Sequence, residues 1–271
     1  MKYIRNKINI IIIGVLISIA IISFFYSSNE IAEINIGIIE IEGAIMDSRY
    51  IVKNLNNFND NDEVDGILVK INSPGGAVVP SQEIYQKVDR ISQESIKPIV
   101  ASISSMGASG GYYIAIGADK IIANPGSVVG SIGVIINYPI AKDLLDKIGL
   151  SFQTYKSGKF KDSGSPYRYA SNEEEEYFRL IIENLHNQFL REVSSQRGIP
   201  IKILNNFANG SIYTGELAYE YNLIDSLGSF EDALNLIKKM TNIEGEIKLI
   251  YPEKDIRSFF DLFSVKNINL Y

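Results

Sequence analysis

Ser109 stands in a run of small residues, Gly107-Ala108-Ser109-Gly110-Gly111, that satisfies the pattern G-x-S-x-G. In hydrolases this pattern places a nucleophilic serine on a tight turn from a strand to a helix, where small neighbours let substrate approach. The backbone N–H of Gly110, at the start of the following helix, could bind the oxyanion formed in acyl transfer. A glycine-rich helix start that packs closely on a sheet gives the same five residues, so the pattern alone makes Ser109 only a candidate.

A serine nucleophile needs a base, and the sequence contains a single histidine, His186. It falls in the middle of a predicted helix and close to its apolar face, whereas the histidine of a hydrolase triad lies on a loop. We therefore expect His186 to be a helix-surface residue. The usual substitute for histidine is the neutral amine of a lysine.

Three lysines, Lys156, Lys159 and Lys161, lie in a predicted basic loop at 156–168. A lysine acts as a base only when neutral, and lowering its pKa from about 10.4 to roughly 7–8 takes on the order of 4 kcal/mol. Burial or a nearby cation could supply this. At least two of the three lysines are explained by an exposed basic loop that aids solubility or binds lipid headgroups. The residues alone do not indicate which of the three lysines would be the base.

Two further glycine turns could line the same site. Ser73-Pro74-Gly75-Gly76 follows a predicted strand, and its amides could supply the other half of an oxyanion hole. Gly130-Ser131-Ile132-Gly133 could form a third wall. Either segment could equally be a plain turn. Without cysteines or clustered histidines, the chain is expected to need no metal or cofactor.

Strands and helices alternate around these turns, which predicts an α/β domain with a largely parallel sheet and ligands at the carboxyl ends of its strands. A capping box, Ser171-Asn172-Glu173-Glu174, opens a long helix. Strands are predicted at 34–45, 65–72, 98–103, 120–124 and 150–155; helices are predicted at 47–57, around 84–91 and at 109–117; and the stretch 104–107 is predicted to be a turn.

The N-terminus has the pattern of a membrane anchor. Residues 1–7 contain three basic residues, and 8–26 form an uncharged apolar stretch that would span roughly 27–29 Å as a helix. The basic flank predicts a cytoplasmic N-terminus and an extracytoplasmic remainder. A cleaved signal peptide is the alternative, although no A-x-A-like site follows. We expect a linker at 27–33, a catalytic domain at 34–250 and a tail at 251–271.

Composition restricts the function further. The 271 residues are 46% apolar and carry a net charge of −6 with a pI near 5.0. Such a chain can bury a sizeable core, and it lacks the basic stripe that nucleic-acid binding requires.

Taken together, the motifs resemble the bacterial signal peptide peptidase A family, Ser-Lys proteases with the Clp protease and crotonase fold. The resemblance implies that Ser109 is the nucleophile, that Lys161, which precedes Asp162, is the base, and that Gly76 and Gly110 supply the oxyanion hole. The segment before Tyr213 differs slightly from the family form. The resemblance rests on Ile71-Asn-Ser-Pro-Gly-Gly76, Met106-Gly-Ala-Ser-Gly-Gly-Tyr-Tyr113, Gly130-Ser-Ile-Gly-Val134, Lys156-Ser-Gly-Lys-Phe-Lys-Asp162, Tyr213-Thr-Gly215 and Leu223-Ile-Asp225.

The same resemblance implies cleavage of apolar peptides such as signal-peptide remnants, and a homo-oligomeric ring or dome at the membrane. Ser109 and Lys161 could then come from one subunit or from two. Two other functions remain open at this point: a crotonase-type acyl-CoA enzyme, which shares the fold, and a catalytically silent membrane scaffold.

Overall fold

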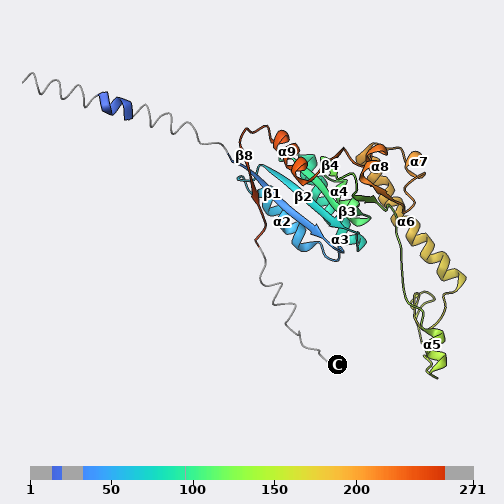
Figure 1. Cartoon of the computed structure of the whole chain (residues 1–271). Coiled ribbons are helices and arrows are strands. Elements are labelled where there is room, and N and C mark those ends of the chain that lie inside the picture. The colour runs from blue at the N-terminus through green and yellow to red at the C-terminus, as the bar shows by residue number, and fades with distance from the viewer. Residues whose placement is uncertain (1–13, 20–32, 95, 254–271) are drawn as a thin grey trace, which may run out of the picture.

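The computed structural model describes residues 14–19, 33–94 and 96–253, and its centre is one mixed sheet (Figure 1). The sheet order is β6-β5-β3-β2-β1-β8, with β4 pairing with β3 and β7. All pairs are parallel except β5 with β6. The predicted α/β class is therefore confirmed. The strands are β1 (Glu33–Glu42), β2 (Gly66–Ser73), β3 (Ile99–Ala108), β4 (Lys120–Ala123), β5 (Val128–Gly130), β6 (Ile212–Thr214), β7 (Ser226–Leu227) and β8 (Glu246–Ile250).

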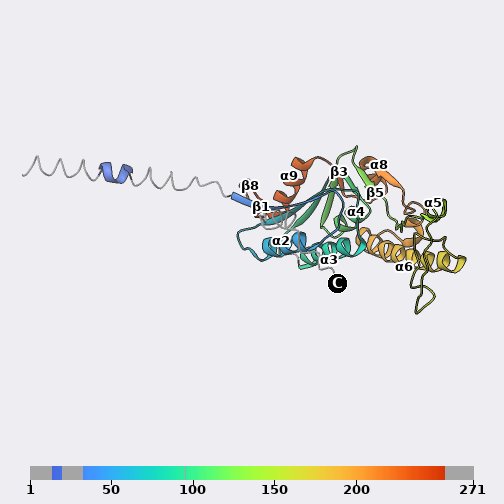
Figure 2. The same cartoon turned by 90° about the horizontal axis from the view of Figure 1, so that it is seen from below.

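Helices cover both faces of this sheet, as the side view shows (Figure 2). On one face, α9 closes a core over Ile34, Ile36 and Ile38 of β1. On the other, α2, α3, α4 and α6 enclose a larger core that takes up Ile39 and Ile41. The isoleucines alternate between faces because successive strand side chains point in opposite directions. The helices are α2 (Arg49–Asp60), α3 (Val78–Glu94), α4 (Gly110–Ala115), α5 (Lys142–Lys147), α6 (Asn172–Arg197), α7 (Ile201–Leu204), α8 (Gly215–Glu220) and α9 (Phe230–Thr241).

The predicted turn at 104–107 is wrong, because β3 continues to Ala108. Its first half pairs with β4, and Met106, Gly107 and Ala108 pair with β5. Beyond Ile103, one edge of β3 therefore pairs with β5 instead of β4, while the other edge still faces β2. This extension carries the chain directly to Ser109 without an intervening loop.

The segment between β5 and α6 also differs from expectation. Residues 150–155 do not form the predicted strand, and the short helix α5 precedes them. Figure 1 shows α5 and the following loop projecting from the sheet beside the N-terminal end of α6. The capping box of α6 is confirmed, because Ser171 accepts from the Glu174 N–H and the Glu174 carboxylate accepts from the Ser171 N–H.

The predicted anchor at 8–26 lies largely outside the described residues, of which only 14–19 fall within it and are helical. No helix in the described part of the chain combines the length and the apolar character needed to cross a bilayer. The anchor therefore stays a prediction. Most of the tail at 251–271 also lies outside the described residues.

Candidate active site

Ser109 occupies the turn between β3 and α4 in a backbone conformation that non-glycine residues rarely adopt. Its φ is 50° and its ψ is −119°. Such conformations cost about 1–3 kcal/mol and persist only where the surroundings enforce them. Here the Ser109 N–H donates to the Gly130 carbonyl at 2.8 Å, and the Ser109 carbonyl accepts from Tyr113 at 2.8 Å. The half-buried Ser109 is thus held at the carboxyl end of a parallel strand.

The first glycine turn packs directly on this serine. A Cβ on Gly75 would lie 2.6 Å from the Gly110 nitrogen and 2.8 Å from the Ser109 Cβ, and Gly75 has a φ of +96°. The buried Ser73 fixes the turn, since its hydroxyl donates to the Gly43 carbonyl at 2.6 Å and accepts from the Gly75 N–H at 3.0 Å. Both the contact and the φ require glycine at position 75.

Gly75→Ala is expected to lower kcat/KM by about 100-fold or more, because the added methyl group must displace Ser109 or Gly110 and a shift of about 1 Å can cost that much. Gly198→Ala is the matched control: its φ is +64°, but a Cβ there meets nothing within 4 Å. We expect the control to lose some thermal stability while keeping its kcat/KM. Equal kcat/KM values for the two variants would show that the contact with Ser109 is unimportant.

Gly76 directly follows Gly75 in the chain, and Gly110 directly follows Ser109. Gly76 forms a parallel bridge with Ile45 through bonds made by Gly75 and Ala77. Neither the Gly76 N–H nor the Gly110 N–H donates to another described residue. Their part as oxyanion-hole donors stays a prediction.

Ser81 of α3 packs against the same turn. A Cβ on Gly110 would lie 2.3 Å from the Ser81 hydroxyl oxygen, and that hydroxyl donates to the Ala77 carbonyl at 2.9 Å. Position 110 therefore has no room for a side chain while α3 holds this place.

The three lysines of the 156–168 loop differ in their partners. The Lys156 ammonium pairs with Asp162, and Lys159 pairs with Glu173 at 2.5 Å. The side chain of Lys161 is exposed and makes no hydrogen bond or ion pair with any described residue. Of the three lysines, Lys161 is therefore the one that forms no ion pair within the part of the chain that the structure describes.

No hydrogen bond or ion pair joins Lys161 to Ser109 among the described residues, and the two lie near different parts of α6. Lys161 belongs to the loop beside the N-terminal end of α6, whereas α4 packs on α6 further along, where Tyr113 meets Phe189 with ring centres 4.6 Å apart. From Glu174 to Phe189 the helix rises about 22 Å, at ~1.5 Å per residue. Figures 1 and 2 both show the loop after α5 extending away from α4.

His186 lies on α6 outside this site. Its Nε2 is 3.0 Å from the Ala208 carbonyl oxygen, in the connection between α7 and β6. It is half-buried there and packs α6 against that connection. The expectation that it has no triad role agrees with this placement.

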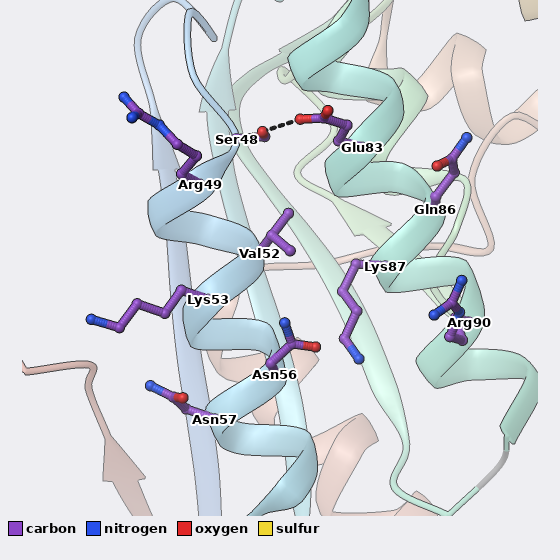
Figure 3. A pocket seen from close by; sticks show the side chains of 10 residues that line it. All are labelled: Ser48, Arg49, Val52, Lys53, Asn56, Asn57, Glu83, Gln86, Lys87 and Arg90. Atoms are coloured by element: carbon purple, nitrogen blue, oxygen red, sulfur yellow. Dashed lines mark hydrogen bonds between the residues drawn. The ribbon is translucent and has the colours of Figure 1, made fainter.

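A groove of about 700 Å³ runs between α2 and α3 and contains none of the predicted site residues (Figure 3). The Ser48 hydroxyl donates to Glu83 across one end of it. Val52 and Lys87 point into the space between the helices, while Lys53 and Asn57 point to the other side of α2. This surface groove is separate from Ser109, and we assign it no part in the chemistry.

Several residues that shape the site were not found from the sequence. Gly75, rather than its neighbour Gly76, makes the contact with Ser109, and Ser73 and Ser81 hold the turn and the start of α4. The role of Ser73 could have been predicted from the sequence, because a serine directly before Pro-Gly-Gly is well placed to accept a hydrogen bond from a turn amide. No sequence pattern indicated the role of Ser81, beyond its place in the first turn of α3.

A strained serine that directly follows a parallel strand and packs on a second glycine turn is typical of the nucleophile of a serine hydrolase. Comparison with known proteins narrows this class. The sequence model of Peptidase family S49 matches residues 91–244, and the Clp protease model matches residues 31–128. The chain therefore belongs to peptidase family S49, and it is a serine endopeptidase with a Clp protease-like domain.

Individual relatives agree. A protein named as a protease in Methanocaldococcus jannaschii is 35% identical over 216 residues, covering 80% of this chain and 69% of the relative. Another from Synechocystis is 42% identical over 197 residues, covering 72% and 70%. A protein named as a signal peptide peptidase in Enterococcus faecium is 39% identical over 176 residues, covering 65% and 51%. The resemblance to the signal peptide peptidase A family is thus confirmed, and an acyl-CoA enzyme or a silent scaffold is not supported.

Proposed function

We propose that this chain is a membrane-anchored endopeptidase that cleaves apolar peptides, such as released signal-peptide remnants, with Ser109 as nucleophile and Lys161 as base. The observation that carries the proposal is the strained backbone of Ser109 at the end of β3, packed on Gly75 and hydrogen-bonded to the Gly130 carbonyl. The side chain of Lys161, which pairs with none of the described residues, supports its part as the base. The relative named as a signal peptide peptidase supports the substrate class.

In the proposed reaction the Lys161 amine takes the proton of Ser109 while the hydroxyl oxygen attacks the peptide carbonyl carbon. The N–H groups of Gly76 and Gly110 stabilise the negative oxygen of the tetrahedral intermediate. Lys161 then gives its proton to the leaving amine, and an acyl-enzyme remains. A water molecule, deprotonated by the same amine, hydrolyses the ester and releases the peptide acid.

We further propose that Ser109 of one subunit works with Lys161 of another. The roughly 22 Å between the Glu174 end of α6 and its contact with α4 supports this arrangement. So does the projecting segment between β5 and α6, which exposes many large apolar side chains; large exposed apolar patches commonly mark protein interfaces. They include Ile135, Leu144, Ile148, Leu150, Phe152 and Tyr155. Burial in such an interface also favours the neutral form of an amine.

The placement at the membrane is proposed from the sequence. Residues 8–26 are apolar and uncharged, and the basic residues of 1–7 favour a cytoplasmic N-terminus with the peptidase domain outside. A retained anchor would tether the peptidase domain to the bilayer, where apolar remnants collect. Mass spectrometry of the mature N-terminus tests this, since a start near residue 28 would rule out the anchor.

The proposed activity is tested with the full-length protein in detergent and a fluorogenic peptide of apolar residues. We expect cleavage by the wild-type protein and none above background by Ser109→Ala. His186→Gln serves as a control that keeps activity, because the one hydrogen-bond partner of His186 among the described residues is the Ala208 carbonyl. Cleavage that survives Ser109→Ala would overturn the proposed mechanism.

A further inference from the structure

Arg168 joins the loop of Lys161 to the start of α6. Its Nη1 and Nη2 donate to the two carboxylate oxygens of Glu174, at 2.7 and 2.5 Å. Its Nε donates to Asp162 Oδ2 at 3.0 Å, and Nη2 also reaches the Asp162 carbonyl at 3.3 Å. One guanidinium therefore binds a helix residue bidentately and a loop residue through both side chain and backbone, which a lysine could not reproduce.

The Glu174 carboxylate both caps α6 and binds the loop that contains Lys161. Only 3% of its side chain is exposed, so its charge requires partners. Besides Arg168, it accepts the Ser163 hydroxyl at 3.0 Å and the Ser171 N–H at 2.9 Å. The carboxylate that caps α6 is therefore the same group that receives Arg168 and Ser163 from the loop.

This network keeps its charges at neutral pH. The hydrogen bond from Arg168, with a second from Lys156, lowers the pKa of Asp162 to about 2. Arg168, the Ser171 N–H and the Ser163 hydroxyl hold the pKa of Glu174 well below its usual range. Both carboxylates are thus ionised wherever a lysine could act as a base.

The contacts fix both chain neighbours of Lys161. On one side, Phe160 stacks on Tyr177 of α6 with ring centres 4.9 Å apart. On the other, Asp162 is held by Arg168. The backbone between them forms a turn in which the Lys161 N–H donates to the Gly158 carbonyl at 3.1 Å. The chain on either side of Lys161 is tied to the first turns of α6, and the Lys161 side chain makes no hydrogen bond or ion pair with the residues that the structure describes.

We propose that Arg168 and Glu174 are positioning residues that fix the place from which Lys161 reaches its serine. The inference rests on the proposed role of Lys161 as the base. It goes further in assigning the placement of the base to the ion pair between Arg168 and the buried Glu174, which does not itself touch substrate. Because the pair acts on the base and not on peptide binding, its loss lowers kcat and leaves KM nearly unchanged.

The test compares Arg168→Gln, the double variant Arg168→Gln with Glu174→Gln, and Lys161→Ala, in full-length protein with the apolar fluorogenic peptide. The double variant leaves no unpaired charge buried, so it remains informative if Arg168→Gln folds poorly. Arg179→Ala is the matched control, because Arg179 also binds two carboxylates on α6, Glu176 and Glu183, and among the described residues it makes no hydrogen bond or ion pair with the loop. Hydrogen exchange of residues 158–165 reports the order of the loop.

We expect kcat to fall by about 10- to 100-fold in the double variant, with KM within about twofold and faster exchange at 158–165. Arg179→Ala should match the wild-type protein. A double variant with wild-type kcat, beside an inactive Lys161→Ala, would overturn this inference alone. An active Lys161→Ala would overturn the proposed base and this inference together.

Discussion

Ser109→Ala is expected to reduce kcat by at least about 10⁴-fold, because loss of the nucleophile leaves only the contributions of binding and of the oxyanion hole. The domain should remain folded, since the bonds that hold this turn use the backbone of Ser109 and not its hydroxyl. Steady-state kinetics and circular dichroism measure the two effects. A variant with more than a few per cent of wild-type kcat would exclude Ser109 as the nucleophile.

Ser109→Gly extends this prediction to stability. Glycine adopts a positive φ without the steric cost that a Cβ brings, and the φ of Ser109 is 50°. We expect Ser109→Gly to be as inactive as Ser109→Ala but more stable than it by about 1 kcal/mol, or roughly 2–4 °C in Tm. If the alanine variant were the more stable, the backbone at this position would not be strained.

Lys161→Ala should lower kcat by about 10³-fold or more, which is in the range that a general base contributes. Lys159→Ala is the control in the same loop, because Lys159 already pairs with Glu173, and its kcat should stay within about threefold of wild type. Comparable losses in both variants would indicate that the basic loop acts through its overall charge and not through one amine.

Mixing the two inactive proteins tests where the pair forms. If Ser109 and Lys161 come from different subunits, co-assembled Ser109→Ala and Lys161→Ala chains include interfaces with one intact serine and one intact lysine. Partial recovery of peptide cleavage is the expected result. Mixed oligomers that stay inactive, although mass spectrometry shows both chains in one assembly, would contradict pairing between subunits.

The central strands of the fold were predicted well from the sequence, because strands buried on both faces form nearly continuous apolar runs. The alternating isoleucines of β1 and the apolar stripe of α3 were readable from their periods. The end of β3 could not be predicted, since Ser104, Ser105 and Gly107 have the composition of a turn, yet all three lie in β3 and Gly107 pairs with Val129 of β5. Long-range pairing overrides local preference at such positions.

The site was predictable in part. The spacing of Gly107, Ser109 and Gly111 pointed to Ser109, whereas the choice of Lys161 among three lysines came from the family resemblance. No local pattern could reveal the link from Arg168 to Glu174, because it depends on how the loop folds back onto α6. The predicted strand at 150–155 is wrong: its apolar residues, among them Leu150 and Phe152, are exposed on the projecting segment.

Activation of Ser109 by Lys161 is tested most directly by labelling with a fluorophosphonate, a serine-directed covalent inhibitor. Mass spectrometry then locates the modified residue. We predict a single adduct on Ser109 in the wild-type protein and in Lys159→Ala, and labelling slowed by about 10³-fold in Lys161→Ala. An adduct on another serine, or equal labelling rates with and without Lys161, would contradict this activation.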